Sequence, residues 1–546
     1  MIDVPGTEAH AAHALPYFLL ALGLSLGTIP LLRSRAVALG LVDRPAARKL
    51  HTAPMARVGG IGIAGGALIA LLLALPLDRL VQAYLAASLL LVGFGIADDR
   101  SELGYRTKFI GQFMAAAVMV FWGGLYVERL PFLHDYVLPA FVAIPFTLVV
   151  TVGVINAFNH SDGLDGLAGG ESLLSLGGIA LLAYWSGDST ALLIALAVLG
   201  GLVGFMRYNS HPAIVFMGDS GSQFLGFTVA FLAILLTQQS NTALSPAVVA
   251  LLIGLPVADI IAVLYLRVRN RMHWFNASRN HLHHRLLGLG FAHGEGVIVL
   301  YLLQALLVVS GVLLRYHHDA VILFGYLTVT FATFALVSRA ERRGWLVRAA
   351  VPNGSSGNGN GRAQLRWMRE LPGHLVLLVA AVYLAHKGLA CIADGSGLLL
   401  PAALLAVSAA VATAWPRVRS CVPVRLAAYA GVILLTYLQG HHPGLAMLPE
   451  AVPLGLLAAF LVLAIRLDGA SFRLTPMDVL VGLALVVLVV AGDHLQLERH
   501  WINLAVKSAI VLYAAEYLMQ RGGVHAGVLL ATMAASLAVV ALGAHC

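Results

Sequence analysis

The chain has 546 residues, of which 60% are hydrophobic and only 11% charged, and its mean hydropathy is +0.87. A soluble core does not need so large an apolar fraction, and the formal net charge of +8 does not by itself indicate a nucleic-acid partner, because in a membrane protein the position of basic residues matters more than their sum. Apolar runs of about 18 to 22 residues recur along the chain, and about 20 helical residues cross a bilayer core. The sequence therefore predicts an all-α, polytopic helical membrane protein.

The opening segment MIDVPGTEAHAAH contains acidic but no basic residues, so it lacks the basic region of a cleaved signal peptide. We therefore expect residues 16–32 to form a retained first membrane span. Ten further spans are predicted in the first part of the chain: 59–75, 82–97, 107–125, 137–157, 166–185, 190–206, 220–238, 244–266, 295–314 and 319–338. Seven more are predicted in the second part: 374–394, 396–414, 425–439, 451–466, 477–492, 501–519 and 524–543.

The segment 339–373 separates these two groups of spans, and its Gly, Ser and Asn centre has almost nothing to bury. This composition is typical of a flexible linker. The predicted organisation is a membrane-embedded core over residues 1–338, a cytoplasmic linker over 339–373 and a C-terminal membrane region of unassigned role over 374–546. The three cysteines lie far apart, with neither metal-ligand nor redox spacing: Cys391, Cys421 and Cys546.

Orientation follows from the basic residues. With the N-terminus outside, all but six of the 34 Lys and Arg residues fall on the inner side, the six being Arg79, Arg129, Arg315, Lys387, Arg499 and Lys507. Basic residues are enriched in cytoplasmic loops, so this orientation is favoured. It puts five polar segments in one compartment: 43–62, 97–108, 156–166, 207–223 and 267–290. Together they predict one composite site at the cytoplasmic membrane surface, where a water-soluble substrate meets a lipid-borne one.

The segment NAFNHSDGLDG carries polar side chains at a regular spacing. Asn156, Asn159, Asp162 and Asp165 recur every three residues, and on an α-helix each such step rotates by about 300°. The four side chains would then form a drifting polar strip over about half the helix circumference. The alternative is a helix N-cap and turn rich in Asn, Asp and Gly.

Two further segments place carboxylates at the ends of apolar runs. Asp98 and Asp99 end one span, and adjacent carboxylates on a helix point in different directions, so one can face a metal or phosphate while the other orients a cation. FMGDSGS sets Asp219 in a tight turn, where it could reach magnesium, a hard cation that prefers oxygen ligands. The structural alternatives are a solvated helix end for the pair and N-capping by Asp219 or Ser220.

The segment NHLHHRLL gathers imidazoles and guanidinium groups: Arg279, His281, His283, His284 and Arg285. Zinc is one reading, but no cysteine lies nearby, whereas structural zinc sites usually have four Cys or His ligands. A clamp for nucleotide phosphates is favoured, because histidine donates to phosphate oxygens and arginine makes bidentate contacts. A basic loop held near anionic lipid is the alternative, and it is compatible with catalysis.

The ordered set GIADDR, NAFNHSDGLDGLAGG, VFMGDSGS and NHLHHRLL resembles the polyprenyl-phosphate N-acetylhexosamine-1-phosphate transferases over residues 16–338. The upstream DRPAARKLHTAPMARVGGIG and the His-rich segment resemble the branch that uses UDP-N-acetylglucosamine or related sugars. The resemblance implies transfer of a sugar-1-phosphate from a UDP-N-acetylhexosamine to undecaprenyl phosphate. The products would be UMP and a lipid-pyrophosphoryl sugar that initiates cell-envelope glycan synthesis. It also implies a multi-pass protein of the bacterial cytoplasmic (inner) membrane, with its active site facing the cytoplasm.

The resemblance assigns roles to the polar residues as well. Asp219 would be the first metal ligand, for Mg2+ with Mn2+ as an alternative ion, and Asp98 would handle the acceptor phosphate and the metal, supported by Asp99. Asp162 and Asp165 would order the nucleotide-sugar and metal neighbourhood. The remaining substrate-binding residues would be Asn156, Asn159, Arg279, His281, His283, His284 and Arg285. Membrane lipids are expected neighbours and nucleic acid is not an expected partner.

Several alternatives stay open. A phospho-N-acetylmuramoyl-pentapeptide transferase-like activity is the alternative within enzymes of this chemistry. An ion-coupled lipid or solute transporter is the alternative from another class, since intramembrane charges are functional suspects. Asp259, inside a predicted span, is the main residue off the common face, and it is read as a cavity or helix-packing residue. The sequence does not distinguish direct from covalent transfer or a monomer from a homodimer.

Overall fold

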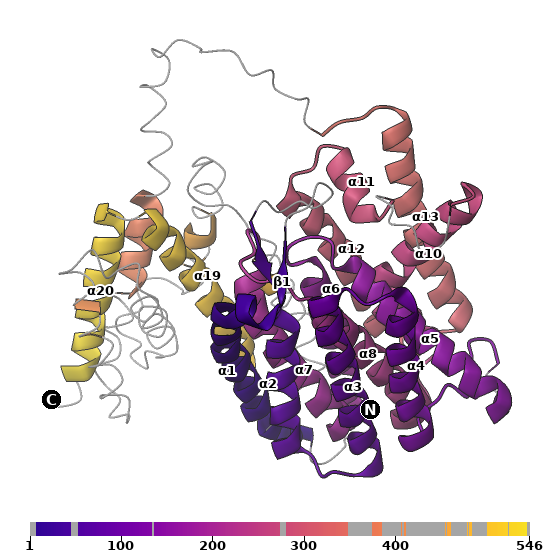
Figure 1. Ribbon diagram of the computed structural model, residues 1–546. Helices are drawn as coiled ribbons and strands as arrows, with labels where there is room; N and C mark the ends of the chain where they lie inside the picture. Colours follow the sequence, from indigo (N-terminus) through magenta and orange to yellow (C-terminus); the bar gives the residue numbers. More distant parts are fainter. Residues whose placement is uncertain are drawn as a thin grey trace. The chain divides into compact units, whose positions relative to one another are not determined.

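The structure is a computed structural model that describes residues 7–44, 53–133, 136–272, 280–347, 374–384, 499–521 and 523–542, with a few isolated residues between 406 and 482 (Figure 1). The chain divides into two compact units. The first is Met1–Val351 with Thr475–Val481, and the second is Pro352–Leu474 with Gly482–Cys546.

The first unit is built almost entirely from helices. In chain order its elements are α1 (Thr7–Leu39), β1 (Val42–Asp43), β2 (Met55–Ala56), α2 (Gly59–Ala74), α3 (Arg79–Ser101), α4 (Tyr105–Ala117), η1 (Val118–Trp122), α5 (Ala140–Ser161), α6 (Leu167–Trp185), α7 (Ser189–Asn209), α8 (Asp219–Leu235), η2 (Leu236–Ser240), α9 (Val248–Leu252), α10 (Gly254–Arg269), α11 (Leu282–Gly288), α12 (His293–Leu314) and α13 (Asp319–Arg342). Among the described residues the only strands are β1 and β2, which pair antiparallel with Val42 opposite Ala56.

Eight of these helices are long and apolar enough to cross a membrane. They are Pro16–Leu39, Arg79–Ser101, Ala140–Ser161, Leu167–Trp185, Ser189–Asn209, Asp219–Ser240, His293–Leu314 and Asp319–Arg342. Each of the other predicted core spans coincides with a shorter helix or a consecutive pair of helices. The prediction of an all-α polytopic membrane protein is therefore confirmed. The span predicted over 244–266 is not one continuous helix, because the chain bends at Ile253 between the five-residue helix α9 and α10.

Helix α8 lies at the centre of the first unit. It packs against α3 and α5 on two sides and also contacts α2 and α6. Every residue from Ser220 to Leu235 is buried, including the rings of Phe224, Phe227 and Phe231. The Tyr84 ring of α3 stacks on Phe227, with ring centroids 6.0 Å apart, and the hydroxyl groups of Tyr84 and Thr228 are hydrogen-bonded at 3.0 Å. Close packing of this kind drives the association of helices in lipid, where the burial of apolar surface contributes little free energy.

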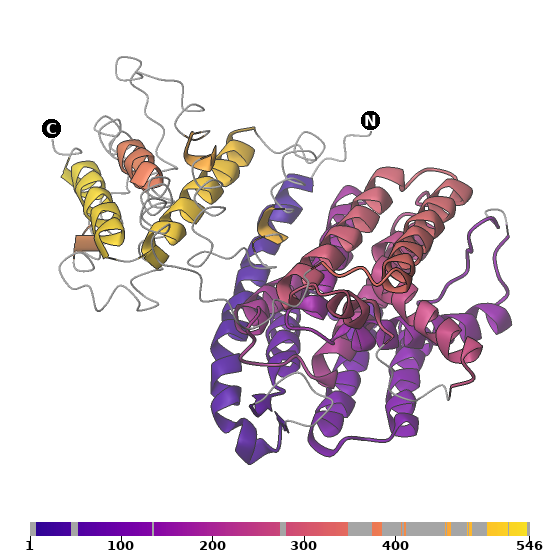
Figure 2. The same ribbon diagram turned by 90° about the horizontal axis from the view of Figure 1, so that it is seen from above.

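Helices α1, α2 and α7 form a second packed group beside α8 (Figures 1 and 2). The described part of the second unit contains the helices His374–Leu384, α19 (Arg499–Arg521) and α20 (Gly523–Leu542). Helices α19 and α20 coincide with the spans predicted over 501–519 and 524–543. The other C-terminal predictions lie largely outside the described residues. So does most of the predicted linker, whose first residues belong to α13.

Candidate active site

The turn before α8 is held by backbone pairing with the end of β2 and the first turn of α2. The amide of Phe216 donates to the carbonyl of Ala56 at 2.8 Å, and the amide of Gly60 donates to the carbonyl of Met217 at 2.8 Å. Gly60 permits this approach, because a Cβ there would lie 2.1 Å from the amide nitrogen of Gly221. The first polar segment of the sequence is thus joined directly to the turn that carries Asp219.

Asp99 caps the start of α8 from the end of α3. Its two carboxylate oxygens accept hydrogen bonds from the amides of Asp219 at 2.9 Å and Ser220 at 3.1 Å, and from the Ser220 hydroxyl at 3.0 Å. Gly218, with φ of +75°, allows the contact, since a Cβ there would lie 2.5 Å from Asp99 Oδ2. The structural alternative, in which Asp219 or Ser220 caps its own helix, is therefore wrong, and the Asp219 side chain is left for other contacts.

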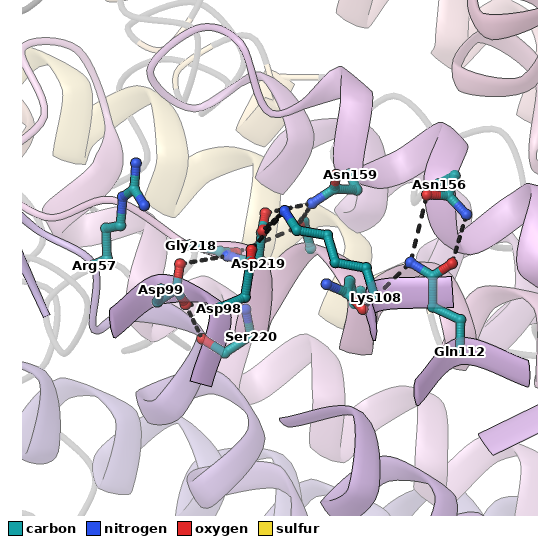
Figure 3. A network of polar contacts seen from close by, with 12 residues as sticks. Arg57, Asp98, Asp99, Lys108, Gln112, Asn156, Asn159, Gly218, Asp219 and Ser220 are labelled. Atoms are coloured by element: carbon teal, nitrogen blue, oxygen red, sulfur yellow. Dashed lines mark hydrogen bonds and ion pairs between the residues drawn. The ribbon is translucent and has the colours of Figure 1, made fainter. Parts of the chain in front are cut away.

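Asp98 and Asp219 are bridged by Lys108 of α4 (Figure 3). The Lys108 ammonium lies 2.6 Å from Asp98 Oδ2 and 2.7 Å from Asp219 Oδ2. The other Asp98 oxygen, Oδ1, is buried and has no hydrogen-bond partner among the described residues. The carboxylates of Asp98, Asp99 and Asp219 thus lie together, and the cation in direct contact with two of them is Lys108. Such a group attracts further positive charge, and its oxygen donors suit a hard divalent ion.

The two asparagines of α5 have different neighbours. Asn159 donates to Asp219 Oδ1 at 2.7 Å and to the Ser222 hydroxyl at 2.8 Å, so it fixes the orientation of the Asp219 carboxylate. Asn156 instead donates to Gln112 Oε1 of α4 at 2.7 Å. In Figure 3 it lies beyond Lys108, away from Asp99. Asn159 is therefore part of the carboxylate group, whereas Asn156 joins α5 to α4.

The helical strip predicted over 156–165 is only half present. Helix α5 ends at Ser161, and Asp162 and Asp165 belong to a turn that leads into α6. Asn209 accepts from the amide of Gly166 at 2.8 Å, and the Tyr301 hydroxyl donates to the Gly166 carbonyl at 2.6 Å. The helical path already ends at Asp162, whose ψ is 57°, and Gly166, with φ of +81°, directly precedes α6. The turn alternative for this segment is the correct one from Asp162 onward.

Asp162 lies within electrostatic range of the carboxylate group. Burial, followed by the negative charges of Asp219, Asp99 and Asp165, raises the pKa of Asp162 to about 7, with Arg57 acting in the opposite direction. Arg57 forms an ion pair with Asp43 at 2.6 Å, and it lies on the side of Asp99 away from Lys108 (Figure 3). Cations therefore flank the carboxylates on two sides, from α4 and from the segment after β2.

Asp165 belongs to a neighbouring group. Its Oδ2 lies 2.8 Å from His211 Nδ1 and 4.0 Å from His293 Nε2, and it accepts from the amide of Ala213 at 3.1 Å. The donor atoms of Asp165, His211 and His293 all lie within 4.8 Å of one another, which is close enough for a metal ion. The two imidazole rings are stacked, however, with centroids 4.1 Å apart. One ion cannot lie in the planes of both rings, so the oxygen-rich group around Asp219 is the better site for magnesium.

The histidines of the fifth polar segment lie beside the end of α5. The His281 ring stacks on His160 and on His283, with centroids 5.6 Å apart in both pairs. Burial, followed by the neighbouring His284 and His281, holds the pKa of His283 well below its usual range, so this imidazole is neutral at pH 7. A neutral imidazole still donates one hydrogen bond to an anion.

One predicted phosphate contact is not brought into this group. Arg285 turns to α13, where it donates to both Glu341 oxygens at 2.9 and 2.7 Å and to the Ser338 hydroxyl at 2.7 Å. Arg279 lies outside the described residues. His284, tilted against His283 at 4.3 Å, also lines a polar pocket of about 810 Å³ between α10, α11 and α13.

Sequence reasoning missed several residues of the site. Lys108 and Arg57 lie inside predicted polar segments, yet nothing in their spacing marks them among the other cations there. Asn209 lies in the predicted segment 207–223, and His160 lies in NAFNHSDGLDG, but neither was singled out. A search for polar side chains facing the same end of neighbouring helices could have found them.

The site residues lie in a part of the chain that matches known proteins. Residues 81–237 match the family Glycosyl transferase family 4, a range that contains Asp98, Asp99, Lys108, Asn159, Asp162 and Asp219. An "Undecaprenyl-phosphate alpha-N-acetylglucosaminyl 1-phosphate transferase" of Yersinia pestis is 34% identical over 289 residues, covering 52% of this chain and 79% of the relative. The protein of that name from Escherichia coli (strain K12) is 31% identical over 322 residues, or 58% of this chain and 87% of the relative.

A third relative, from Bacillus subtilis (strain 168), is named "Probable undecaprenyl-phosphate N-acetylglucosaminyl 1-phosphate transferase". It is 33% identical over 301 residues, which cover 55% of this chain and 84% of the relative. These matches extend over most of the length of each relative. The resemblance carried by the four ordered motifs is confirmed, and this chain belongs to the family of polyprenyl-phosphate N-acetylhexosamine-1-phosphate transferases.

Proposed function

We propose that this protein transfers N-acetylhexosamine-1-phosphate from a UDP-sugar to undecaprenyl phosphate, at the cytoplasmic face of a bacterial inner membrane. The family supports the sugar-1-phosphate transfer and the lipid acceptor, because three relatives are named for that activity. The observation that carries the proposal to this chain is the group of Asp98, Asp99 and Asp219 held against Lys108 at the ends of membrane helices. This group offers carboxylates for a metal ion and a lysine for phosphate oxygens, as two phosphate-bearing substrates require.

The reaction joins two anions. A phosphate oxygen of the lipid attacks the sugar-linked phosphorus of the UDP-sugar, and a new pyrophosphate bond forms. The bond from that phosphorus to the bridging oxygen breaks, and UMP leaves with the electron pair. Because both partners are negatively charged, the protein must position them and stabilise the charge that builds up during transfer. The product is a lipid-pyrophosphoryl sugar, the starting unit of a cell-envelope glycan.

Asp219 and Asp98 are the residues that would hold Mg2+, with Mn2+ as an alternative ion. Their fit rests on the buried Asp98 Oδ1, which has no partner among the described residues, and on two carboxylates close enough to share one ammonium group. Bound magnesium would supply positive charge for the phosphate oxygens. Asn159 would keep the Asp219 carboxylate in place, and Asp99 would keep the start of α8 in place.

Lys108 and Arg57 would act on the phosphates directly. Lys108 is one-third exposed and flexible, so it can leave one carboxylate for an incoming phosphate oxygen once a metal neutralises that carboxylate. Proton removal by Asp98 has little to contribute, since a phosphate monoester has a second pKa near 6 and is mostly dianionic at pH 7. Positioning is therefore the role proposed for Asp98.

The test uses the purified full-length protein with undecaprenyl phosphate, magnesium and either UDP-N-acetylglucosamine or UDP-N-acetylgalactosamine. We expect equal amounts of UMP and lipid-pyrophosphoryl sugar, and loss of both when the metal is chelated. A monodisperse protein that releases no UMP from any UDP-N-acetylhexosamine, but moves an ion or solute across vesicles, would instead establish the transporter alternative.

A further inference from the structure

Asp259 is a buried carboxylate of α10 that lies outside the group around Asp219. Its exposed fraction is 8%, and both of its oxygens are used. Oδ2 lies 2.8 Å from His281 Nδ1, and Oδ1 accepts from the amide of Leu282 at 2.8 Å. A charge in such an environment is costly unless it is paired and hydrogen-bonded. His281 and the start of α11 therefore account for a carboxylate inside an apolar helix.

We propose that Asp259 is a positioning residue that fixes both the tautomer of His281 and the start of the helix that carries His283. The proposal rests on the proposed function, because it treats His281 as a contact of the donor phosphates. A carboxylate can only accept a hydrogen bond from Nδ1, so Nδ1 keeps its proton whether the ring is neutral or charged. Nε2 is then the one ring nitrogen left to bind a reactant.

The position of His281 connects this pair to the carboxylate group. Its ring stacks on His160, which is the residue after Asn159 on the last turn of α5, and Asn159 donates to Asp219. His160 also lies within electrostatic range of both Asp219 and Asp259. Among the described residues Nε2 of His281 has no hydrogen-bond partner in the structure. Asp259 therefore holds the Nδ1 side of the His281 imidazole, and this imidazole lies next to the carboxylate group around Asp219.

The same two contacts exclude a simpler role for Asp259 as a filler of a helix interface. A filler needs no carboxylate, whereas here one oxygen serves the backbone of α11 and the other serves a side chain. An asparagine at this position would still accept from the Leu282 amide. Its NH2 group would face Nδ1 as a donor, however, and would force the His281 proton onto Nε2. The amide variant thus separates orientation of the imidazole from capping of the helix.

The experiment is a double-mutant cycle on the full-length protein with Asp259→Asn, His281→Ala and the double variant. The readouts are kcat/KM from UMP release and binding of UDP-N-acetylglucosamine by calorimetry. Loss of the carboxylate behind a functional histidine typically costs about 10- to 100-fold in affinity or activity. We expect each single variant to lose this amount and the double variant to lose no more than about threefold beyond the worse single one. Losses that multiply in the double variant, or a wild-type level in Asp259→Asn, would overturn the proposal.

Two further variants control for folding. Asp78→Asn changes a carboxylate that accepts from the Val81 amide at 2.8 Å at the start of α3, at the other end of the helix from Asp98, and it should stay within about threefold of the wild type. Asp259→Glu keeps a carboxylate, should recover part of the lost activity, and replaces the amide variant if that one does not fold. If Asp78→Asn lost as much activity as Asp259→Asn, the effect of Asp259 would be explained by helix capping alone, and the proposed role would be refuted.

The tautomer can be read without turnover. In 15N-histidine spectra, His281 should carry its proton on Nδ1 in the wild type and lose that signal in Asp259→Asn. If the tautomer of His281 differed between the wild type and Asp259→Asn as expected, but the wild type released no UMP, the proposed function would fail and the positioning role would stand. An Nε2-protonated neutral His281 in the wild type would overturn the positioning role, whatever the activity.

Discussion

Asp219→Asn tests the centre of the site, because both oxygens of Asp219 already accept hydrogen bonds. Oδ1 accepts from Asn159 and Oδ2 from Lys108, each at 2.7 Å. An amide can satisfy only one of these donors, so one charge-assisted hydrogen bond is lost, worth about 1.5–3 kcal/mol. The loss is partly offset because Asp98, Asp99 and Asp162 no longer face a fourth negative charge. We therefore expect the free energy of unfolding to change by no more than about 2 kcal/mol.

The effect on catalysis should be much larger. Removing one electrostatic contact to a transition state costs about 10²- to 10³-fold in kcat, or about 2.7–4 kcal/mol, and loss of the proposed magnesium ligand would add to this. The assay is UMP release over a magnesium titration, with thermal unfolding measured in parallel. Asp188→Asn is the matched control, because Asp188 caps α7 through the Ala191 amide at 2.9 Å, away from the carboxylate group. Near-normal magnesium-dependent turnover by a folded Asp219→Asn protein would refute the reasoning, as would an equal loss in the control.

Three further predictions use the same assay. Lys108→Met, which keeps the alkyl stem but removes the bridging charge, should lower kcat about 10- to 100-fold without weakening magnesium binding, and an unchanged kcat would contradict its role. Since burial and nearby carboxylates raise the pKa of Asp162 to about 7, magnesium should displace its proton at lower pH. The affinity of the protein for magnesium should then rise by up to about tenfold per pH unit up to pH 7 and level off above pH 7. In Asp162→Asn the magnesium affinity should depend much less on pH. Gly60→Ala should destabilise the fold by about 1–3 kcal/mol and lower kcat, because its Cβ would lie 2.1 Å from the Gly221 amide nitrogen. Gly65→Ala on the same helix meets nothing within 4 Å and should change neither quantity.

The sequence predicted the helical class and the polar segments, because apolar length and charge position are local properties of the chain. It could not predict that Asp99 caps α8, since that contact joins residues 120 positions apart. For the same reason the choice of Lys108 among several cations, and of Glu341 as the partner of Arg285, needed the packed helices. The sequence predicts for Asp259 a place in a cavity or a helix interface, and its contacts with His281 and Leu282 are visible only in the structure.

The misread helical strip has a local cause. A spacing of three between polar residues predicts a continuous helix only if nothing interrupts it. Here the backbone leaves the helical path at Asp162, and Asn209 and Tyr301 on other helices hold the turn farther along, at Gly166. Glycines in the segment signalled a break, but sequence patterns place the ends of helices only to within a few residues. The sequence shows that these carboxylates lie close together along the chain, but it could not predict that Asp162 and Asp165 belong to two different groups of side chains.

Because Asp219 is the first residue of α8, the proposed metal-binding centre is attached to the one candidate membrane span, among those in the described residues, whose apolar segment is completely buried. Helices α1 and α13 at the edge of the first unit have apolar segments that are only 17% buried. When a bilayer is thinner or thicker than the protein, the edge helices can tilt to match it, at a cost of fractions of a kcal/mol per Å. The depth of the carboxylates would then stay nearly constant. Transferase activity should accordingly vary little among vesicles of different acyl-chain length, so that lipid composition would affect the supply of acceptor more than the site itself.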